Sequence, residues 1–386
     1  AVGSLQGVEA VSDAAGWLRF SGMSRRNGLL RVTASGRQPE GVLAVLDVEV
    51  GREVVELEPV VVVEEAAVRF VFTGDTSLGR RYLDPEERAA RDAVPKDHPD
   101  ALIQASDPDP GSRAVFDHVR GWLADAEVLV TNLETVVTDR PETPHPTKDY
   151  VIFTLPESLA ALTELGVDWI SLGNNHVYDY LEAGVVDTMA AVAATGVPSG
   201  GMGSTPEEAF APSGVEAGGV RWRMVAANSV SGRQHAIDYQ ADEVSGGAAD
   251  LDDEARVAEA IADAWEAGEV PLAFLHTGVE YTEAPTPLTV ARFERVAADG
   301  AAFIVATHPH TAQGFGWHGG ALAAWSLGNF AFDQDRLETY QAVVLLADLM
   351  LDGRPLAVRA APLYVEDYVP KLLGGEPGGL LALRMA

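Results

Sequence analysis

The stretch IVATHPHTAQG, residues 304–314, runs from an apolar, strand-like segment directly into His308-Pro309-His310. The chain has only nine histidines, so two of them two positions apart at the end of a buried strand need an explanation. In an extended segment, side chains at positions i and i+2 point to the same side. Two imidazoles on one side are compatible with a metal site, a phosphate site or a polar loop. The rest of the sequence has to decide between these three.

Four other apolar, strand-like segments end in the same way. A single Gly-Asp or Asn-Asn-His segment is most often a turn or a cap. In an α/β sheet, however, ligands bind outside the carboxyl ends of the strands. Five polar strand ends in one chain therefore predict a shared crevice. The other four are Gly74-Asp75, Asn132-Leu133-Glu134, Asn174-Asn175-His176 and the segment from His276 to Glu280.

The pattern of the chain changes at residue 67. From there, strand-like segments alternate with helical patterns, which predicts an α/β domain with covered sheets. Residues 1–66 instead contain short alternating runs separated by Gly and Pro, which predict a small antiparallel β domain. Helices are expected over 111–126, 155–166, 182–196, 252–268 and 286–300, strands over 68–75 and 321–330, and a closing hairpin in the last 50 residues.

Composition excludes several classes of function. The net charge of −31 argues against nucleic acid as a partner, because binding a phosphate backbone needs a basic surface. The absence of cysteine excludes disulfides, thiolate catalysis and Cys-based zinc sites. No apolar run is long enough to span a membrane. The start at Ala1, without a signal pattern, leads us to expect that a leader was removed or the chain was trimmed.

The residue types at the strand ends favour metal chemistry. Oxygen and imidazole ligands without sulfur suit Mn, Fe, Zn, Ca or Mg. Six candidate ligands exceed the needs of one tetrahedral zinc and suit two metals about 3.5–4 Å apart with a bridging carboxylate. A serine nucleophile is a weaker interpretation, since no G-x-S-x-G motif occurs. A phosphate cradle is also weaker, because no Walker-type loop occurs.

Six motifs occur in order along the chain: FTGDTSLGRR, TNLET, SLGNNHVYDY, LHTGVEY, THPHTAQG and WSLGNFAFD. Together they resemble the CapA or poly-γ-glutamate capsule-synthesis family, which is similar to the calcineurin-like metallophosphoesterases. The resemblance covers residues 67–365 and implies a four-layer α/β/β/α sandwich with a dinuclear metal site. It predicts a CapA-like domain over 67–386, with the small β-rich domain of residues 1–66 outside it.

The resemblance also implies roles for individual residues. His176 matches the non-ligand histidine that serves as general acid or base. Asp179 would orient that imidazole, or else cap a helix start. Arg80 would hold an anionic substrate group, or else be a solvated surface arginine. The implied ligands of two divalent ions (Mn, Fe, Zn or Ca) are Asp75, Glu134, Asn175, His276, His308 and His310.

The remaining candidates carry less weight. Glu280 and Lys148 are weaker site candidates. Four histidines are expected in loops or on the surface: His118, His145, His235 and His318.

Two positions depart from the metallophosphoesterase pattern. The first motif of that pattern is Asp-x-His, but here it reads Asp75-Thr76-Ser77, so one ligand of the first metal is missing or replaced. The last motif usually opens with Gly, and here Thr307 precedes His308. The first departure predicts weak binding of one metal and puts a true phosphoesterase activity in question.

Three functions are compatible with these residues. The first is a metal-dependent hydrolase or transferase acting on a phosphoester or on a γ-glutamyl or other amide, with a small-molecule, peptide or polymer substrate. The second is a metal-dependent epimerase that moves a proton at an α-carbon through a histidine. The third is a non-enzymatic capsule or cell-envelope assembly protein. We expect an enzyme, with hydrolase ahead of epimerase and an extracellular or envelope location slightly favoured. The oligomeric state stays open.

Overall fold

The computed structural model describes residues 2–5, 8–20, 28–34, 40–44, 67–235 and 237–385. In the N-terminal part, four strands form an antiparallel sheet in the order β2-β1-β3-β4. They are β1 (Val2–Leu5), β2 (Val8–Val11), β3 (Gly28–Thr33) and β4 (Glu40–Ala44). The expected antiparallel β structure is thus present here. Residues 45–66 lie outside the described residues, and the domain boundary at residue 66 stays a prediction.

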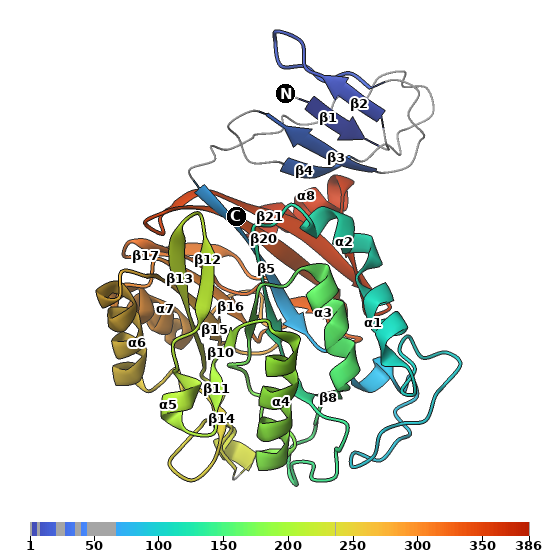
Figure 1. Cartoon of the computed structure of the whole chain (residues 1–386), viewed down its shortest axis with the longest axis vertical. Helices are drawn as coiled ribbons and strands as arrows, with labels where there is room; N and C mark the ends of the chain where they lie inside the picture. Colours follow the sequence, from blue (N-terminus) through green and yellow to red (C-terminus); the bar gives the residue numbers. More distant parts are fainter. Residues whose placement is uncertain are drawn as a thin grey trace.

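Strand β5 (Ala67–Thr76) lies inside an eight-stranded sheet of order β10-β9-β6-β5-β20-β21-β22, in which β19 also pairs with β5 (Figure 1). The strands β6, β9, β10 and β19 join it in parallel pairs, whereas β20, β21 and β22 continue it in antiparallel pairs. The predicted closing hairpin is β20 and β21. Their bounds are β6 (Val128–Leu133), β9 (Trp169–Ser171), β10 (Ser199–Gly200), β19 (Asn329–Ala331), β20 (Gln341–Met350), β21 (Pro355–Glu366) and β22 (Val369–Leu372).

A second sheet has six strands in the order β12-β13-β15-β16-β18-β17. Its central strands, from β13 to β18, are parallel, and an antiparallel strand lies at each edge. The strands are β12 (Gly214–Ala217), β13 (Val220–Asn228), β15 (Val270–His276), β16 (Phe303–Thr307), β17 (Phe315–His318) and β18 (Ala321–Ala324). Two small sheets pair β7 (Val136–Val137) with β8 (Phe153–Thr154) and β11 (Met202–Gly203) with β14 (Gly247–Ala248).

The helices begin and end at residues suited to those positions. The Thr286 side chain accepts a hydrogen bond from the Thr289 amide at the start of α7, and Pro287 fills the first helical position. Helix α4 ends at Gly196, whose φ of 77° favours glycine. The α-helices are α1 (Pro108–Val115), α2 (Asp117–Leu123), α3 (Ala160–Leu165), α4 (Leu181–Thr195), α5 (Pro206–Ala209), α6 (Glu254–Glu266), α7 (Pro287–Ala298) and α8 (Gly375–Met385). The 3₁₀ helices are η1 (Arg80–Tyr82), η2 (Pro156–Leu159), η3 (Arg233–His235) and η4 (Leu337–Tyr340).

The helices and the two large sheets form four layers (Figure 1). Three apolar cores lie between successive layers. The first lies between the eight-stranded sheet and helices α1 to α4, where Leu129 and Leu162 belong to one cluster. The second lies between the two sheets and contains Phe72 and Phe274, whose rings are 6.2 Å apart. The third lies between the six-stranded sheet and helices α6 and α7. The predicted α/β/β/α sandwich is therefore confirmed.

Two predicted elements were wrong in detail. The helix expected over 111–126 is divided at Phe116, whose backbone leaves the helical region, so α1 and α2 are separate helices. The strand expected over 321–330 is two strands in different sheets. β18 belongs to the six-stranded sheet, and β19 crosses to pair with β5. The chain changes sheets at Gly328, whose φ of 72° is in the left-handed region.

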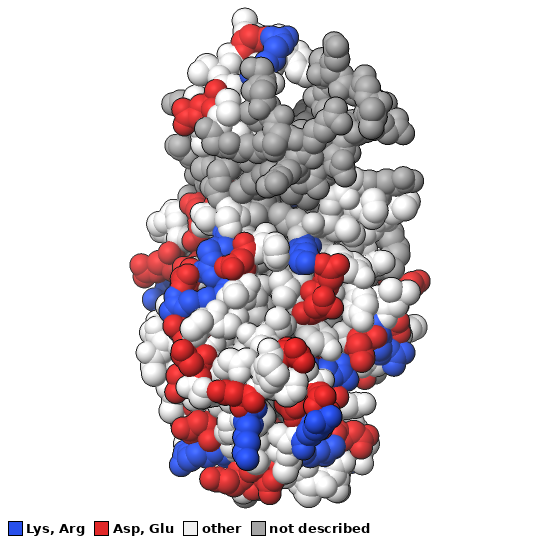
Figure 2. Space-filling view, turned by 90° about the vertical axis from the view of Figure 1, so that its right-hand side faces the viewer, with Lys and Arg blue, Asp and Glu red and all other residues white. Residues whose placement is uncertain are grey.

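The surface of the described residues carries charges of both signs. On the face shown in Figure 2, Asp and Glu side chains are interspersed with Lys and Arg, and the described part of this face shows no broad basic area. Several of these charges form exposed ion pairs, such as Arg256 with Glu207 and Arg295 with Glu254. Among the described residues, each helix is too short or too polar to traverse a bilayer.

A bulge in β5 sets the direction of one predicted ligand. Phe70 and Phe72 face the core between the sheets, and strict alternation would turn Asp75 to the face covered by helices. The register of β5 against β6 shifts between Phe72 and Asp75. After this shift, Asp75 pairs with Asn132 of β6. Asn132 lies on the same face of β6 as Val130, which belongs to the core between the sheets. The bulge therefore keeps Asp75 on the face between the sheets.

Gly74 allows the close contact that accompanies this bulge. A Cβ atom at Gly74 would lie 1.8 Å from the carbonyl oxygen of Gly328. The next residue, Asp75, donates its amide proton to the same carbonyl oxygen at 3.0 Å. Any larger side chain at position 74 would thus push β5 and β19 apart.

We expect Gly74→Ala to lower the free energy of unfolding by about 1–3 kcal/mol, the usual cost of overpacking a tight interior. The control is Gly121→Ala in α2, where a Cβ would have nothing within 4 Å. That change should be neutral or stabilising, since alanine favours helix. Urea unfolding followed by circular dichroism measures both. Equal stability of the wild-type protein and Gly74→Ala would contradict the prediction.

Candidate metal centre

The ends of five strands bring all six predicted ligands into one buried cluster. Asp75 is the penultimate residue of β5, and Glu134 directly follows β6. His276 ends β15 in the other sheet. The cluster thus lies where the carboxyl ends of both sheets meet, as expected for an α/β fold. The six buried side chains are Asp75, Glu134, Asn175, His276, His308 and His310.

Two overlapping triads of potential ligand atoms share Glu134. The first consists of Glu134, His276 and His308, and the second of Asp75, Glu134 and His310. In each triad, one ligand atom per residue lies within 4.8 Å of the other two. We name them the His276 position and the Asp75 position. A carboxylate common to two triads is the arrangement expected of a bridging ligand.

Asn175 belongs beside the His276 position. Its side-chain oxygen Oδ1 lies 2.7 Å from His276 Nε2, and His308 Nδ1 lies 3.2 Å from the same nitrogen. His276 Nε2 also lies 3.4 Å from Glu134 Oε1. Four donor atoms from three strand ends and one bend therefore converge on one point.

Glu134 provides the test of whether this cluster suits metal ions. Its side chain is fully buried, and neither carboxylate oxygen has a hydrogen-bond partner among the described residues. Burial raises the pKa of Glu134 well above its usual value, and the nearby carboxylate of Asp75 raises it further. A buried carboxylate without partners is costly unless a cation compensates it. The oxygen and imidazole donors here suit divalent metal ions.

The imidazoles of the His276 position are held in the neutral form that binds metal. Burial lowers the pKa of His308 to about 3 and lowers the pKa of His276 well below its usual value. At His310, burial also disfavours the charged ring, but the hydrogen bond and charge of Asp75, with the contributions of Glu280 and Asn329, together outweigh burial and raise the pKa. Burial would raise the pKa of Asp75, yet the interactions with His310 lower it strongly. The two positions therefore differ in their electrostatics.

Three polar residues orient the ligands. Asn132 donates its side-chain amide to Asp75 Oδ1 at 2.8 Å. Thr307 Oγ1 lies 3.0 Å from His276 Nδ1, and Asn329 Oδ1 lies 2.9 Å from His310 Nδ1. Such partners fix the ring orientation of ligating side chains. The sequence placed Asn132 at a polar strand end of the predicted crevice, but it indicated an orienting role for none of these three residues.

The backbone at His308 and His310 differs from the expected extended conformation. Strand β16 ends at Thr307, and both histidines lie on a bend with φ values of 102° and 57°. The i, i+2 argument for two imidazoles on one side is therefore wrong here. Positive φ at non-glycine residues is strained and is concentrated at functional sites. The bend sends the two rings to different triads, with centroids 6.2 Å apart.

His176 is held between the cluster and two charged residues. Its Nδ1 lies 2.6 Å from Asp179 Oδ2 and 3.2 Å from Lys148 Nζ. Its Nε2 lies 3.8 Å from Glu134 Oε1. Burial lowers the pKa of His176 to about 4, although Asp179 opposes this shift. The orienting contact expected of Asp179 is thus present.

Lys148 proves more central than the sequence indicated. Its Nζ donates to Asp179 Oδ1 at 2.5 Å and to the backbone oxygen of Asn175 at 2.8 Å. It also lies 4.5 Å from the centre of the Tyr239 ring. One lysine from the loop 140–149 therefore links the loop that carries Asn175 and His176 to the acidic partner of His176.

Other predicted residues lie elsewhere or differ in burial. Arg80 contacts Asp333 and Glu87 and lines a pocket of about 340 Å³, and none of the six predicted ligands lines that pocket. Its role as an anion holder stays a prediction. Glu280 is exposed, with Oε1 4.0 Å from His310 Nε2.

The expectation that four histidines lie in loops or on the surface was wrong for His318, which is a buried residue of β17, whereas His145 lies in a loop as expected although it is buried. His118 is exposed and His235 is half-buried. His145 is buried, because its Nδ1 accepts the amides of Thr147 and Lys148 and its ring packs near Tyr239. His318 is buried as well, and its Nε2 accepts the indole proton of Trp325.

One protein-family model matches the region of the chain that contains this cluster. The family model "Bacterial capsule synthesis protein PGA_cap" matches residues 69–334, well over half of the chain. The chain belongs to this family. All six predicted ligands, His176 and Lys148 fall inside the PGA_cap match. The resemblance inferred from the six motifs is confirmed.

Two curated proteins are similar to this PGA_cap chain. The PGA biosynthesis protein CapA of Bacillus subtilis (strain 168) is 25% identical over 244 residues, covering 63% of this chain and 63% of the relative. The capsule biosynthesis protein CapA of Bacillus anthracis is 26% identical over 265 residues, covering 68% of this chain and 64% of the relative. The chain therefore matches less than two thirds of the length of either relative.

Two solved structures from Thermus thermophilus are also similar. A 5'-nucleotidase precursor aligns with a TM-score of 0.41 and 14% identity, covering 79% of this chain and 56% of that chain. The protein TT1561 aligns with a TM-score of 0.39 and 9% identity, covering 76% of this chain and 98% of that chain.

The raised pKa of Glu134 predicts a proton change on metal binding. The raised pKa favours the protonated form of this carboxyl in the metal-free protein, whereas only the deprotonated form can act as a ligand. We expect the wild-type protein to release more protons than Glu134→Gln, and metal binding to tighten as pH rises. Calorimetric titration in buffers of different ionisation enthalpy measures this difference. Equal proton release by both proteins would contradict it.

Proposed function

We propose that this PGA_cap protein is a dinuclear metal-dependent enzyme that hydrolyses or transfers a phosphoester or amide bond. One observation carries the proposal: the buried carboxylate of Glu134, which has no hydrogen-bond partner among the described residues, is shared by two triads of histidine and carboxylate side chains. A structural salt bridge would have satisfied that carboxylate with a cationic side chain. Two metal ions would satisfy it instead and explain why both triads share it.

The ligand assignment follows from the triads. Asp75, Glu134 and His310 would hold one ion, and Glu134, His276 and His308 would hold the other. Asn175 Oδ1, at 2.7 Å from His276 Nε2, would complete the second set. This geometry supports one histidine of the pair His308 and His310 on each ion. When bound, such a pair of ions polarises the scissile group and lowers the pKa of water.

His176 is proposed as the residue that moves a proton. Its Nδ1 is close enough to donate to Asp179 Oδ2, which leaves the lone pair of Nε2 on the side of Glu134. The lowered pKa keeps the ring uncharged near neutral pH. His176 is therefore poised to accept a proton first and to return it to the leaving group. Asp179 and Lys148 hold the ring in place, and Lys148 also restrains the backbone of Asn175.

The family indicates the class of substrate. One relative is named for PGA biosynthesis and the other for capsule biosynthesis, so we propose a phosphoester or amide of a capsule polymer or its precursor. The net charge of −31 would repel a polyanion, and bound divalent ions would reduce that repulsion locally. Family and fold do not define the reaction, so epimerisation and a non-enzymatic assembly role are outcomes that the experiments below distinguish.

Elemental analysis tests the metal centre directly. We expect about two divalent ions per wild-type chain after incubation with Mn, Zn or Fe. His308→Ala should lower that number without unfolding the chain, whereas the exposed His118 in α2 provides a control, His118→Ala, with unchanged content. No bound ion in the wild-type protein would replace the enzyme proposal with the assembly role.

A second variant separates chemistry from metal binding. His176→Ala should keep the wild-type metal content yet lower turnover by about 10²- to 10⁴-fold, the usual range for a general acid–base residue. Turnover is measured with bis(p-nitrophenyl) phosphate and γ-glutamyl p-nitroanilide. Epimerisation is measured separately, as exchange of α-protons for deuterium in glutamyl peptides. Full turnover by His176→Ala would remove the proposed proton transfer.

A further inference from the structure

Ser77 occupies the place of the missing histidine in the first motif, and its side chain has an unusual environment. It is buried, with 1% of its surface exposed, and its hydroxyl has no hydrogen-bond partner among the described residues. A buried hydroxyl without a partner is unfavourable in a folded protein. The direction of the Ser77 side chain therefore has to show which group its hydroxyl could contact.

The backbone shows that Ser77 and Asp75 point the same way. The amides of Asp75 and Ser77 both donate toward the β19 side, to the carbonyl oxygens of Gly328 at 3.0 Å and Ala331 at 2.8 Å. The carbonyl oxygen of Thr76, between them, accepts on the opposite side, from the residue that follows β6. Residues 75–77 are thus extended, and side chains two positions apart share one face.

The neighbours of Ser77 agree with this direction. Leu78 belongs to the core under the helices, so Ser77, one position earlier, faces the space between the sheets. Asp75 lies on that face together with Glu134 and His310 of its triad. The unpartnered hydroxyl is therefore placed on the same side of the strand as the Asp75 position.

We propose that the Ser77 hydroxyl is an oxygen donor to the ion at the Asp75 position and makes the two positions chemically unequal. This inference rests on the proposed dinuclear centre. The Asp75 position would then offer three oxygen donors, from Asp75, Glu134 and Ser77, and a single imidazole, from His310. The His276 position offers two imidazoles and two oxygens.

This difference in donors predicts different ions. Oxygen-rich positions suit harder cations such as Mn²⁺ and Mg²⁺, whereas imidazole-rich positions suit Zn²⁺ or Fe²⁺. A serine hydroxyl is also a weaker donor than a neutral imidazole and is shorter, so the Asp75 position holds its ion less tightly. The protein would thus work with one tightly bound transition metal and one exchangeable hard cation.

A sequential titration tests this assignment. Metal-free protein receives one equivalent of Zn²⁺ and is then titrated with Mn²⁺, with free Mn²⁺ followed by its electron paramagnetic resonance signal and total metal by elemental analysis. We expect one Zn²⁺ and one Mn²⁺ per wild-type chain. Ser77→Ala should weaken Mn²⁺ binding by about tenfold or more and leave the Zn²⁺ unchanged.

Three further variants make the result specific. Ser77→Thr keeps a hydroxyl and should bind Mn²⁺ as the wild-type protein does, even where Ser77→Ala fails to fold. Ser77→His should bind a second Zn²⁺ in competition with Mn²⁺. Ser158→Ala is the matched control, because the Ser158 hydroxyl in η2 is also buried without a partner among the described residues and should not affect either ion.

The outcomes separate this inference from the proposed function. Wild-type affinity for Mn²⁺ in Ser77→Ala would overturn the role of Ser77 while leaving the dinuclear centre intact. Two equally bound Zn²⁺ ions in the wild-type protein would overturn the inequality of the positions. Uptake of neither Zn²⁺ nor Mn²⁺ by the wild-type protein would overturn the dinuclear centre itself.

Discussion

The interaction on which the site depends is the burial of the Glu134 carboxylate without a partner among the described residues. Its two oxygens lie inside a cluster of carboxylate, amide and imidazole groups. Groups of that cluster are in turn fixed by other residues, as Asn132 fixes Asp75 and Asn329 fixes His310. The surroundings are therefore satisfied while the central group is not. A cation that bound at this point would compensate the cost of burying the carboxylate.

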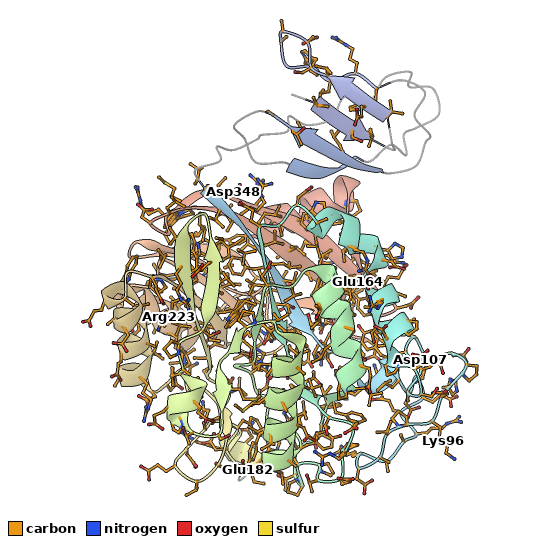
Figure 3. All side chains as sticks on the ribbon, in the orientation of Figure 1. Lys96, Asp107, Glu164, Glu182, Arg223 and Asp348 are labelled. Atoms are coloured by element: carbon orange, nitrogen blue, oxygen red, sulfur yellow. The ribbon has the colours of Figure 1, made fainter. Side chains whose placement is uncertain are left out.

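A second buried carboxylate, that of Asp348, lies at the opposite end of the eight-stranded sheet and is paired with arginine side chains. Arg69, at the start of β5, places Nε 2.7 Å from Asp348 Oδ1, and Arg359 approaches Asp348 Oδ2 at 2.7 Å. Figure 3 shows Asp348 far from Glu182, which lies at the start of α4 just beyond Asp179. A buried carboxylate paired with arginines serves structure, and removing either partner would be costly. Asp348, at one end of the sheet, is thus paired with two arginines, whereas Glu134, which follows β6 at the other end, has no hydrogen-bond partner among the described residues.

Local patterns predicted the α/β class and the crevice at the strand ends, whereas the four layers and the individual ligands were implied by the family resemblance. Strands that end in Asp, Glu, Asn and His could be located from continuous apolar runs and helix signals alone, as at His276. Contacts between distant segments could not. Lys148 reaches Asp179 from a loop whose residues show no pattern, and the loop is held partly by the buried ring of His145. The crossing of 321–330 between two sheets depends on the turn at Gly328, which local periodicity does not reveal.

The bulge in β5 also constrains how the length of this chain can vary in evolution. Between Phe72 and Asp75 the strand changes the face to which successive side chains point. Gain or loss of one residue there would exchange the two faces, moving the carboxylate under the helices and an apolar side chain into the ligand cluster. Relatives that keep the centre should therefore show single-residue insertions and deletions in surface loops but none between these two residues. The number of residues between Phe72 and Asp75 is therefore constrained in the family, independently of which residues they are.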